Sequence, residues 1–298
     1  MTDIGKLATE QRNAASEHID RLPTLDMVRL INNEDKKVAG AVEAVCPQIA
    51  EAIDGIYARM QRGGRLIYTG CGTSGRLGVL DAAECPPTYS TDPERVRAVI
   101  AGGYGAMFAA VEGAEDDRSL GAEDLKALHL TEDDSVVGIA ASGRTPYVLG
   151  ALDYAKSVGA LTIAVTCCPG CEAEAHADIA ISPAPGPEVI PGSTRMKSGT
   201  AQKMILNMLS TGVMVKLGKV YGNLMVDVKA SNEKLRERCV RIVRQATGAE
   251  DAAARAALIE TNYACKTAIV MLLLGVDKAA AETLLTRANG RVAAALEG

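Results

Sequence analysis

The sequence has few aromatic residues, few histidines and no long basic run. Its 298 residues include no Trp, one Phe and three His, and aromatic residues make up 3% of the chain. Because the formal net charge is −5 and no aromatic platform is present for base stacking, we do not expect nucleic acid as a partner. The core must instead be built from aliphatic side chains, as in many helix-rich α/β proteins.

The sequence also lacks the signals of a membrane or secreted protein. The longest apolar run, residues 268–276, is shorter than the roughly 20 residues that a spanning helix needs. The first residues have no basic-then-apolar layout, and eight cysteines in a chain of this length do not make a disulfide scaffold. We therefore expect a cytoplasmic protein with reduced thiols and no membrane partner.

A cysteine cluster at residues 167–171 resembles a metal-binding pattern. No second cysteine pair follows at zinc-like spacing, and His176 is the only histidine nearby. We expect this stretch to be a loop after a strand, and we expect no metal site.

Apolar strands and helical stretches alternate through the middle of the chain. We expect strands at 65–69, 96–100, 135–140, 161–166 and 179–182, with helices at 75–84, 106–115, 146–157 and 172–175. The third and fourth strands are apolar on both faces, as in a parallel sheet that helices cover. The pattern predicts a doubly wound, three-layer α/β/α domain that binds ligands at the carboxyl ends of its strands.

Helices are expected in the sequence before and after these strands. Residues 1–60 have helical spacing, with Asp35 as a cap and Pro47 either kinking the helix or dividing it. A long helix is expected at 198–217. Beyond residue 240, Ala-rich stretches broken by glycines predict a small C-terminal module of three helices.

The loop after the first strand has the composition of an anion pocket. Residues 70–76 contain three glycines and the hydroxyls of Thr73 and Ser74, at the start of a helix whose N–H groups are free. A double proline at 86–87 is expected to end this helix, so that Glu84 terminates it instead of lying on a solvated face. A phosphate holder and a carboxylate in one unit indicate chemistry on a phosphorylated small molecule.

Two further loops of this kind follow. Residues 140–146 place Ser142 and Thr145 near a helix N-terminus, and residues 192–200 combine hydroxyls with two cations where the long helix begins. One such loop is a weak signal because strand-to-helix turns favour small residues, but three predict a sugar-phosphate site. None has the glycine spacing of a nucleoside triphosphate or dinucleotide site, so those ligands are disfavoured.

A second candidate acid/base group, Glu115, lies in an acidic cluster after the second strand. Composition alone favours a solvated acidic face for this cluster. No Ser/His/Asp triad is apparent, because all three histidines lie outside the loops.

These loops resemble those of the bacterial N-acetylmuramic acid 6-phosphate etherases, and the resemblance extends over nearly the whole chain. The motifs that carry it are residues 72–78, 81–89, 111–116, 138–147, 193–197 and 222–227. The resemblance implies a sugar isomerase (SIS) domain with a flavodoxin-like parallel sheet at residues 55–220. An N-terminal helical segment (1–54) would precede this domain and a C-terminal helical region (221–298) would follow it.

The resemblance also implies a reaction. The lactyl ether at C3 of N-acetylmuramic acid 6-phosphate is cleaved to N-acetylglucosamine 6-phosphate and D-lactate, without a metal or another cofactor. Glu84 matches the proton donor to the lactyl oxygen, and Glu115 matches the acid/base group at C2. The positions that match substrate contacts are Gly72, Thr73, Ser74, Ser142, Gly143, Arg144, Thr145, Ser193 and Lys197. A homodimer is implied as well.

Two other functions remain open on the sequence. The first is a non-catalytic phosphosugar-binding regulator that resembles the glucokinase regulatory protein, although that protein has two SIS domains and this chain has room for one. The second is an aldose–ketose phosphosugar isomerase. The presence of both Glu84 and Glu115 favours the etherase, and the helical tail after residue 240 argues against the isomerase.

Overall fold

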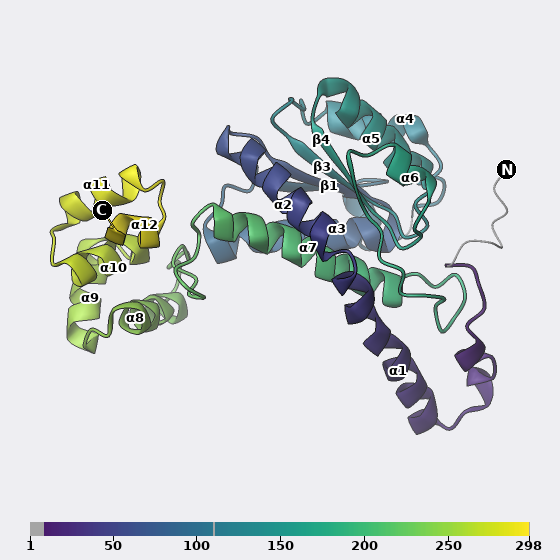
Figure 1. Ribbon diagram of the computed structural model, residues 1–298, viewed down its shortest axis with the longest axis horizontal. Helices are drawn as coiled ribbons and strands as arrows, with labels where there is room; N and C mark the ends of the chain where they lie inside the picture. The colour runs from purple at the N-terminus through teal and green to yellow at the C-terminus, as the bar shows by residue number, and fades with distance from the viewer. Residues whose placement is uncertain (1–8, 110, 298) are drawn as a thin grey trace. The chain divides into compact units, whose positions relative to one another are not determined.

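The computed structural model describes residues 9–109 and 111–297 (Figure 1). The chain forms two compact units: residues up to 83 with residues 94–210, and residues 84–93 with residues from 211 onward. The first eight residues of the predicted helical segment lie outside the described part. The domain limits at 54/55 and 220/221 stay predictions.

The first unit is built on a five-stranded parallel sheet, which confirms the predicted fold class. The strands are β1 (Leu66–Gly70), β2 (Val96–Ile100), β3 (Ser135–Ile139), β4 (Leu161–Val165) and β5 (Ile179–Ile181), in the order β2-β1-β3-β4-β5. Leu66 of β1 pairs with Val96 on one side and Ser135 on the other. Every residue of β1, β3 and β4 is buried, because these strands are apolar on both faces and covered by helices.

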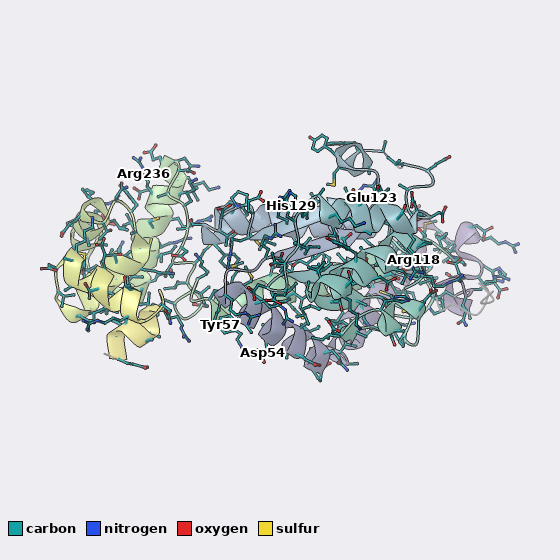
Figure 2. The ribbon with its side chains drawn as sticks, turned by 90° about the horizontal axis from the view of Figure 1, so that it is seen from above. Asp54, Tyr57, Arg118, Glu123, His129 and Arg236 are labelled. Atoms are coloured by element: carbon teal, nitrogen blue, oxygen red, sulfur yellow. The ribbon has the colours of Figure 1, made fainter. Side chains whose placement is uncertain are left out.

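Helices cover both faces of this sheet. On one face, α5 (Pro146–Val158) packs on β1, β3 and β4 and against α4 (Arg118–Lys126). On the other face, α2 (Cys46–Gln61) packs on β3, β4 and β5. In Figure 2, Glu123 of α4 lies on the opposite side of this unit from Asp54 and Tyr57 of α2. The short α6 (Glu172–Ala175) precedes β5 as predicted. The unit is therefore the three-layer sandwich that the strand pattern predicts.

Helices α3 (Gly72–Tyr89) and α7 (Lys197–Lys216) are joined by side-chain hydrogen bonds within the first unit. Ser74 Oγ donates to Gln202 Oε1 at 2.9 Å, and Ser210 Oγ donates to Asp81 Oδ1 at 3.1 Å. All four side chains are buried. The start of α3 and the start of α7, which are far apart in the sequence, are thereby brought together.

The segment before the sheet forms η2 (Ala14–Ser16), η3 (Ile19–Arg21) and α1 (Thr24–Glu43), followed by α2. The predicted cap at Asp35 is wrong, because this residue lies inside α1. The helix is divided just before Cys46, and Pro47 occupies the first turn of α2, where its missing N–H costs no hydrogen bond.

Two other local predictions are wrong. The double proline does not end its helix, because α3 continues through Pro86 and Pro87 to Tyr89. The two prolines lack backbone N–H groups, but they lie near the end of the helix, so few of its hydrogen bonds are lost. The helix predicted at 106–115 is wrong: apart from residue 110, which lies outside the described part, the stretch forms the end of η4 (Tyr104–Met107) and turns. The helix begins instead at α4, where the Asp117 carboxylate accepts from two first-turn N–H groups at 2.9 and 3.1 Å.

The second unit contains the C-terminal helices. They are α8 (Glu233–Thr247), α9 (Asp251–Glu260), α10 (Cys265–Leu274), α11 (Lys278–Arg287) and α12 (Val292–Glu297), so the described part of this region has five helices where three were predicted. One unpredicted break follows α9, where Asn262 and Tyr263 adopt φ values of 50° and 63° without any glycine. Within the described residues, no helix has both the length and the apolarity to cross a bilayer.

Candidate active site

Two hollows in the first unit meet at Glu115. The first, of about 270 Å³, is lined by Cys71, by Gly72 and Arg76 of α3, by Ala101 and Ala106, and by residues 111–115. The second, of about 350 Å³, is lined by Glu10, Glu115, Asp116, Ser142, Arg144, Thr145 and Pro146. The fold therefore brings the first two predicted loops to the acidic cluster, at the carboxyl ends of the strands where α/β sheets bind ligands.

The junction of β1 with the first turn of α3 depends on glycine. Gly72 has φ +51°, and a Cβ on Gly75 would lie 2.5 Å from the carbonyl oxygen of Gly70. In α3, just after this junction, Arg76 Nε donates to the carbonyl oxygen of Met107 at 3.0 Å. Arg76 lines the first hollow but was not among the predicted contacts; its place at the end of the glycine motif is the signal that points to it.

The turn between β3 and α5 presents hydroxyls and one guanidinium. Gly143 has φ +65°, and a Cβ there would lie 2.1 Å from Cys171 Sγ, so no other residue fits without displacement. Helix α5 starts with Pro146, and the Thr145 side chain makes no capping bond to it. Ser142, Arg144 and Thr145 are half-buried and line the second hollow. A guanidinium beside hydroxyls at a helix start is suited to an anion such as phosphate.

Glu115 is held by its backbone while its side chain stays exposed. Its carbonyl oxygen accepts a hydrogen bond from the N–H of Tyr147 at 3.0 Å. Tyr147 is buried and its hydroxyl donates to Asp124 Oδ2 at 2.6 Å, which ties α5 to α4 beneath this point. Burial, with the nearby charges of Glu115 and Asp116, raises the pKa of the Cys71 thiol to about 12. That thiol is therefore held in its neutral form at pH 7.

The third predicted loop is used differently from the first two. Glu188 is fully buried and accepts from the backbone N–H groups of Lys197 and Ser198, both at 2.9 Å, so it occupies the N-terminus of α7. Lys197 is also buried, and its ammonium pairs with Glu34 Oε2 at 2.8 Å. Burial alone would raise the pKa of Glu34, but hydrogen bonds from Lys197, Lys37 and Asn13 lower it to about 2.

Several predicted contacts do not line either hollow. Ser74 is bonded to Gln202, Thr73 lies close to Gly199 of α7, and Ser193 is half-buried in the loop before α7. Lys197 would have to release or share Glu34 before its ammonium could bind phosphate. The roles of these four residues stay predictions.

Glu84 also stays a prediction. It lies in α3 with an exposed side chain, in the segment 84–93 that groups with the second unit. It is not among the residues that line the two hollows.

The cysteine cluster has separate partners for each thiol. Cys167 Sγ lies 3.7 Å from the carbonyl oxygen of Ser198, Cys168 Sγ lies 3.9 Å from Thr9 Oγ1, and Cys171 Sγ lies 3.5 Å from Thr166 Oγ1. Among residues 9–109 and 111–297, no three His, Cys, Asp or Glu side chains are grouped to hold a metal ion.

Family models match most of the chain. The N-terminal SIS domain of glucokinase regulatory protein matches residues 48–156, the SIS domain matches residues 108–212, and the C-terminal lid domain of glucokinase regulatory protein matches residues 222–270. Among solved structures, a phosphoheptose isomerase from Francisella tularensis matches with a TM-score of 0.48 and 20% identity, over 64% of this chain and 98% of that chain.

Curated relatives match nearly end to end. N-acetylmuramic acid 6-phosphate etherase 1 of Vibrio cholerae is 57% identical over 294 residues, covering 99% of this chain and 98% of that protein. The N-acetylmuramic acid 6-phosphate etherase of Caldanaerobacter subterraneus subsp. tengcongensis is 59% identical, covering 99% of this chain and 96% of that protein. With this identity and coverage, the chain belongs to the N-acetylmuramic acid 6-phosphate etherase family.

Proposed function

We propose that this protein cleaves the lactyl ether of N-acetylmuramic acid 6-phosphate, giving N-acetylglucosamine 6-phosphate and D-lactate. The near full-length identity to proteins named for this activity supports the proposal. The structural observation that carries it is the position of Glu115 between two hollows, one of which presents Ser142, Arg144 and Thr145.

The geometry suits an elimination followed by hydration. In the open-chain aldehyde the C2 proton is acidic because it is α to a carbonyl, and Glu115 is the carboxylate that takes it. The C3–O bond then breaks, and the lactyl oxygen leaves with the electron pair and accepts a proton. Water adds its oxygen to C3 of the conjugated alkene, and a proton returns to C2.

Charge complementarity supports the same substrate. N-acetylmuramic acid 6-phosphate carries a phosphate and a carboxylate, and two guanidinium groups, Arg76 and Arg144, line the two hollows beside Glu115. Arginine binds both kinds of anion with paired hydrogen bonds. In this proposal Glu84 protonates the departing lactyl oxygen, a role that rests on the family resemblance alone.

The test is release of D-lactate from N-acetylmuramic acid 6-phosphate, measured with a coupled D-lactate dehydrogenase assay. Loss of an acid/base group costs about 10²- to 10⁴-fold in rate, so Glu84→Gln and Glu115→Gln should each lower kcat by this amount. Glu123→Gln is the matched control, because Glu123 is exposed on α4 and lines neither hollow. An active Glu115→Gln variant would contradict the assignment of the base.

A phosphosugar-binding regulator is the second candidate, because two of the matching family models carry the name of the glucokinase regulatory protein. Tight binding of the phosphosugar without lactate release would support the regulator. Deuterium incorporation at C2 from heavy water without ether cleavage would instead indicate an isomerase.

We also infer a cytoplasmic homodimer. Leu25 and Val28, one turn apart on α1, are 59% and 55% exposed, and Met208 of α7 is 37% exposed. Apolar side chains exposed in this way favour burial against a second copy. Light scattering after size-exclusion chromatography measures the mass: twice the chain mass of 31.1 kDa is expected, and a monomer would contradict the dimer.

A further inference from the structure

The segment of residues 9–16, which we call the N-terminal strap, is fastened to the loop before α7. The carbonyl oxygen of Thr9 accepts from the N–H of Gly192 at 3.0 Å. At the other end of the strap, Ser16 Oγ donates to the carbonyl oxygen of Val189 at 2.7 Å, and this bond is buried. Both ends of the strap are therefore bonded to the same loop.

A buried polar network fixes the middle of the strap. Asn13 Nδ2 donates to Glu34 Oε2 at 2.9 Å and to the carbonyl oxygen of Pro187 at 3.1 Å. The same oxygen of Glu34 accepts from Lys197 Nζ at 2.8 Å. Because these groups are buried and bonded to one another, moving the strap would leave polar atoms unsatisfied.

Between these fixed points lies Glu10, which lines the second hollow together with Glu115 and Arg144. A Cβ on Gly192 would lie 3.4 Å from Glu10 Oε2, so this carboxylate sits beside the third predicted loop. Glu10 thus connects that loop to the candidate active site. Neither the spacing of the strap nor its composition indicated this role.

The residues that line the second hollow are suited to different groups of a substrate. Arg144 and the neighbouring hydroxyls attract an anion, whereas carboxylates repel it. A carboxylate accepts hydrogen bonds from hydroxyl and amide N–H groups, which an N-acetylated sugar carries. We propose that Glu10 is a substrate-positioning residue that accepts such hydrogen bonds from the sugar and places C2 over Glu115. This inference rests on the proposed function of the same site.

The first experiment compares Glu10→Ala, Glu10→Gln and Glu17→Gln. A hydrogen bond to a charged group is worth about 1.5–3 kcal/mol, so Glu10→Ala should lower kcat/KM about 10- to 100-fold, mainly through KM. Glu10→Gln should recover part of the loss because its amide oxygen still accepts. Glu17→Gln is the matched control, because Glu17 is exposed. In the described residues its one ion pair is with Arg12, at 3.5 Å.

Two further readouts separate positioning from acid/base work and from a structural role. The pH profile of kcat/KM should keep the shape of the wild-type profile in Glu10→Ala, and thermal unfolding should be unchanged. Loss of one limb of the profile with an unchanged KM would make Glu10 an acid/base group and overturn the positioning role.

The strap itself is tested with Ser16→Ala. This change removes the buried bond to Val189 and should lower kcat/KM several-fold by loosening Glu10. The same change in the Glu10→Ala background should have no further effect, because coupled residues are not additive. Additive losses would overturn positioning through the strap.

Binding of N-acetylglucosamine 6-phosphate, measured by calorimetry, separates this inference from the proposed function. If the wild type binds this sugar but releases no lactate, the proposed function fails, and Glu10 is judged by whether Glu10→Ala weakens binding. If Glu10→Ala matches the wild type in both assays, the inference is overturned and the proposed function stands. If the wild type neither binds nor cleaves, both are overturned.

Discussion

The N-termini of α5 and α7 are similar in sequence but opposite in what they do. Both helices follow a loop with hydroxyls and a cation. At α5, the Thr145 side chain makes no capping bond and Arg144 lines a hollow. At α7, Glu188 occupies the first N–H groups and Lys197 is buried against Glu34.

The difference shows that an anion-binding sequence is satisfied either by a ligand or by the protein's own carboxylates. The first outcome leaves an open site, and the second makes a rigid junction. Substitutions at α5 should therefore change function, and substitutions at α7 should change stability.

The largest effect is expected at Lys197. Lys197→Met removes the buried ammonium from the carboxylate of Glu34, which keeps only Lys37 and Asn13 as partners, and this should lower the free energy of unfolding by about 3 kcal/mol. Urea denaturation followed by circular dichroism measures this loss. Lys203→Met is the control, because Lys203 is exposed on the same helix. A Lys197→Met protein that is as stable as the wild type but no longer binds phosphosugar would contradict the structural role of the α7 N-terminus and make Lys197 a ligand contact.

A pH dependence should follow from Glu34. Its pKa is lowered from 4.5 to about 2, so its stabilising contribution is present above pH 4.5 and is lost as the pH falls from 4.5 towards 2. The loss should be at most about 3 kcal/mol. Urea unfolding at several pH values between 7 and 2.5 measures it, and Glu34→Gln should flatten this part of the curve. An unchanged slope in that variant would mean that the buried pair does not set acid stability.

At α5 the expected effect is on substrate affinity. Arg144→Met should raise KM by about 10- to 100-fold and weaken N-acetylglucosamine 6-phosphate binding, with no change in unfolding. Steady-state kinetics and calorimetry measure these changes, with Arg118→Met as a control from the surface of α4. A large loss of stability in Arg144→Met would contradict the open-site description.

The smallest effect is expected at Thr145. Because its side chain makes no capping bond, Thr145→Ala should leave the melting temperature nearly unchanged, unlike a usual cap removal. Asp117→Ala is the comparison, since Asp117 does cap α4 and its removal should lower the melting temperature more. Differential scanning calorimetry measures both. If Thr145→Ala lowered the melting temperature more than Asp117→Ala does, the Thr145 hydroxyl would stabilise the helix and would not be free to bind a ligand.

Much of the fold could be predicted from local pattern. The strands at 135–140 and 161–166 were predicted to within one residue because both faces of each strand are apolar. The acidic cluster was ambiguous: composition favoured a solvated face, whereas the structure places Glu115 between two hollows. Local composition cannot distinguish these outcomes, because both leave a carboxylate exposed.

The remaining differences come from contacts that are distant in the sequence. Lys197 and Glu34 are 163 residues apart, and no spacing rule indicates that they pair. Glu10 reaches the second hollow only because the strap is bonded to the loop before α7. The sequence by itself determined the parallel sheet, the glycine turns and the family, because periodicity and backbone conformation are local. Only the tertiary structure decided which helix N-terminus stays open, because burial and charge pairing depend on which distant side chains arrive there.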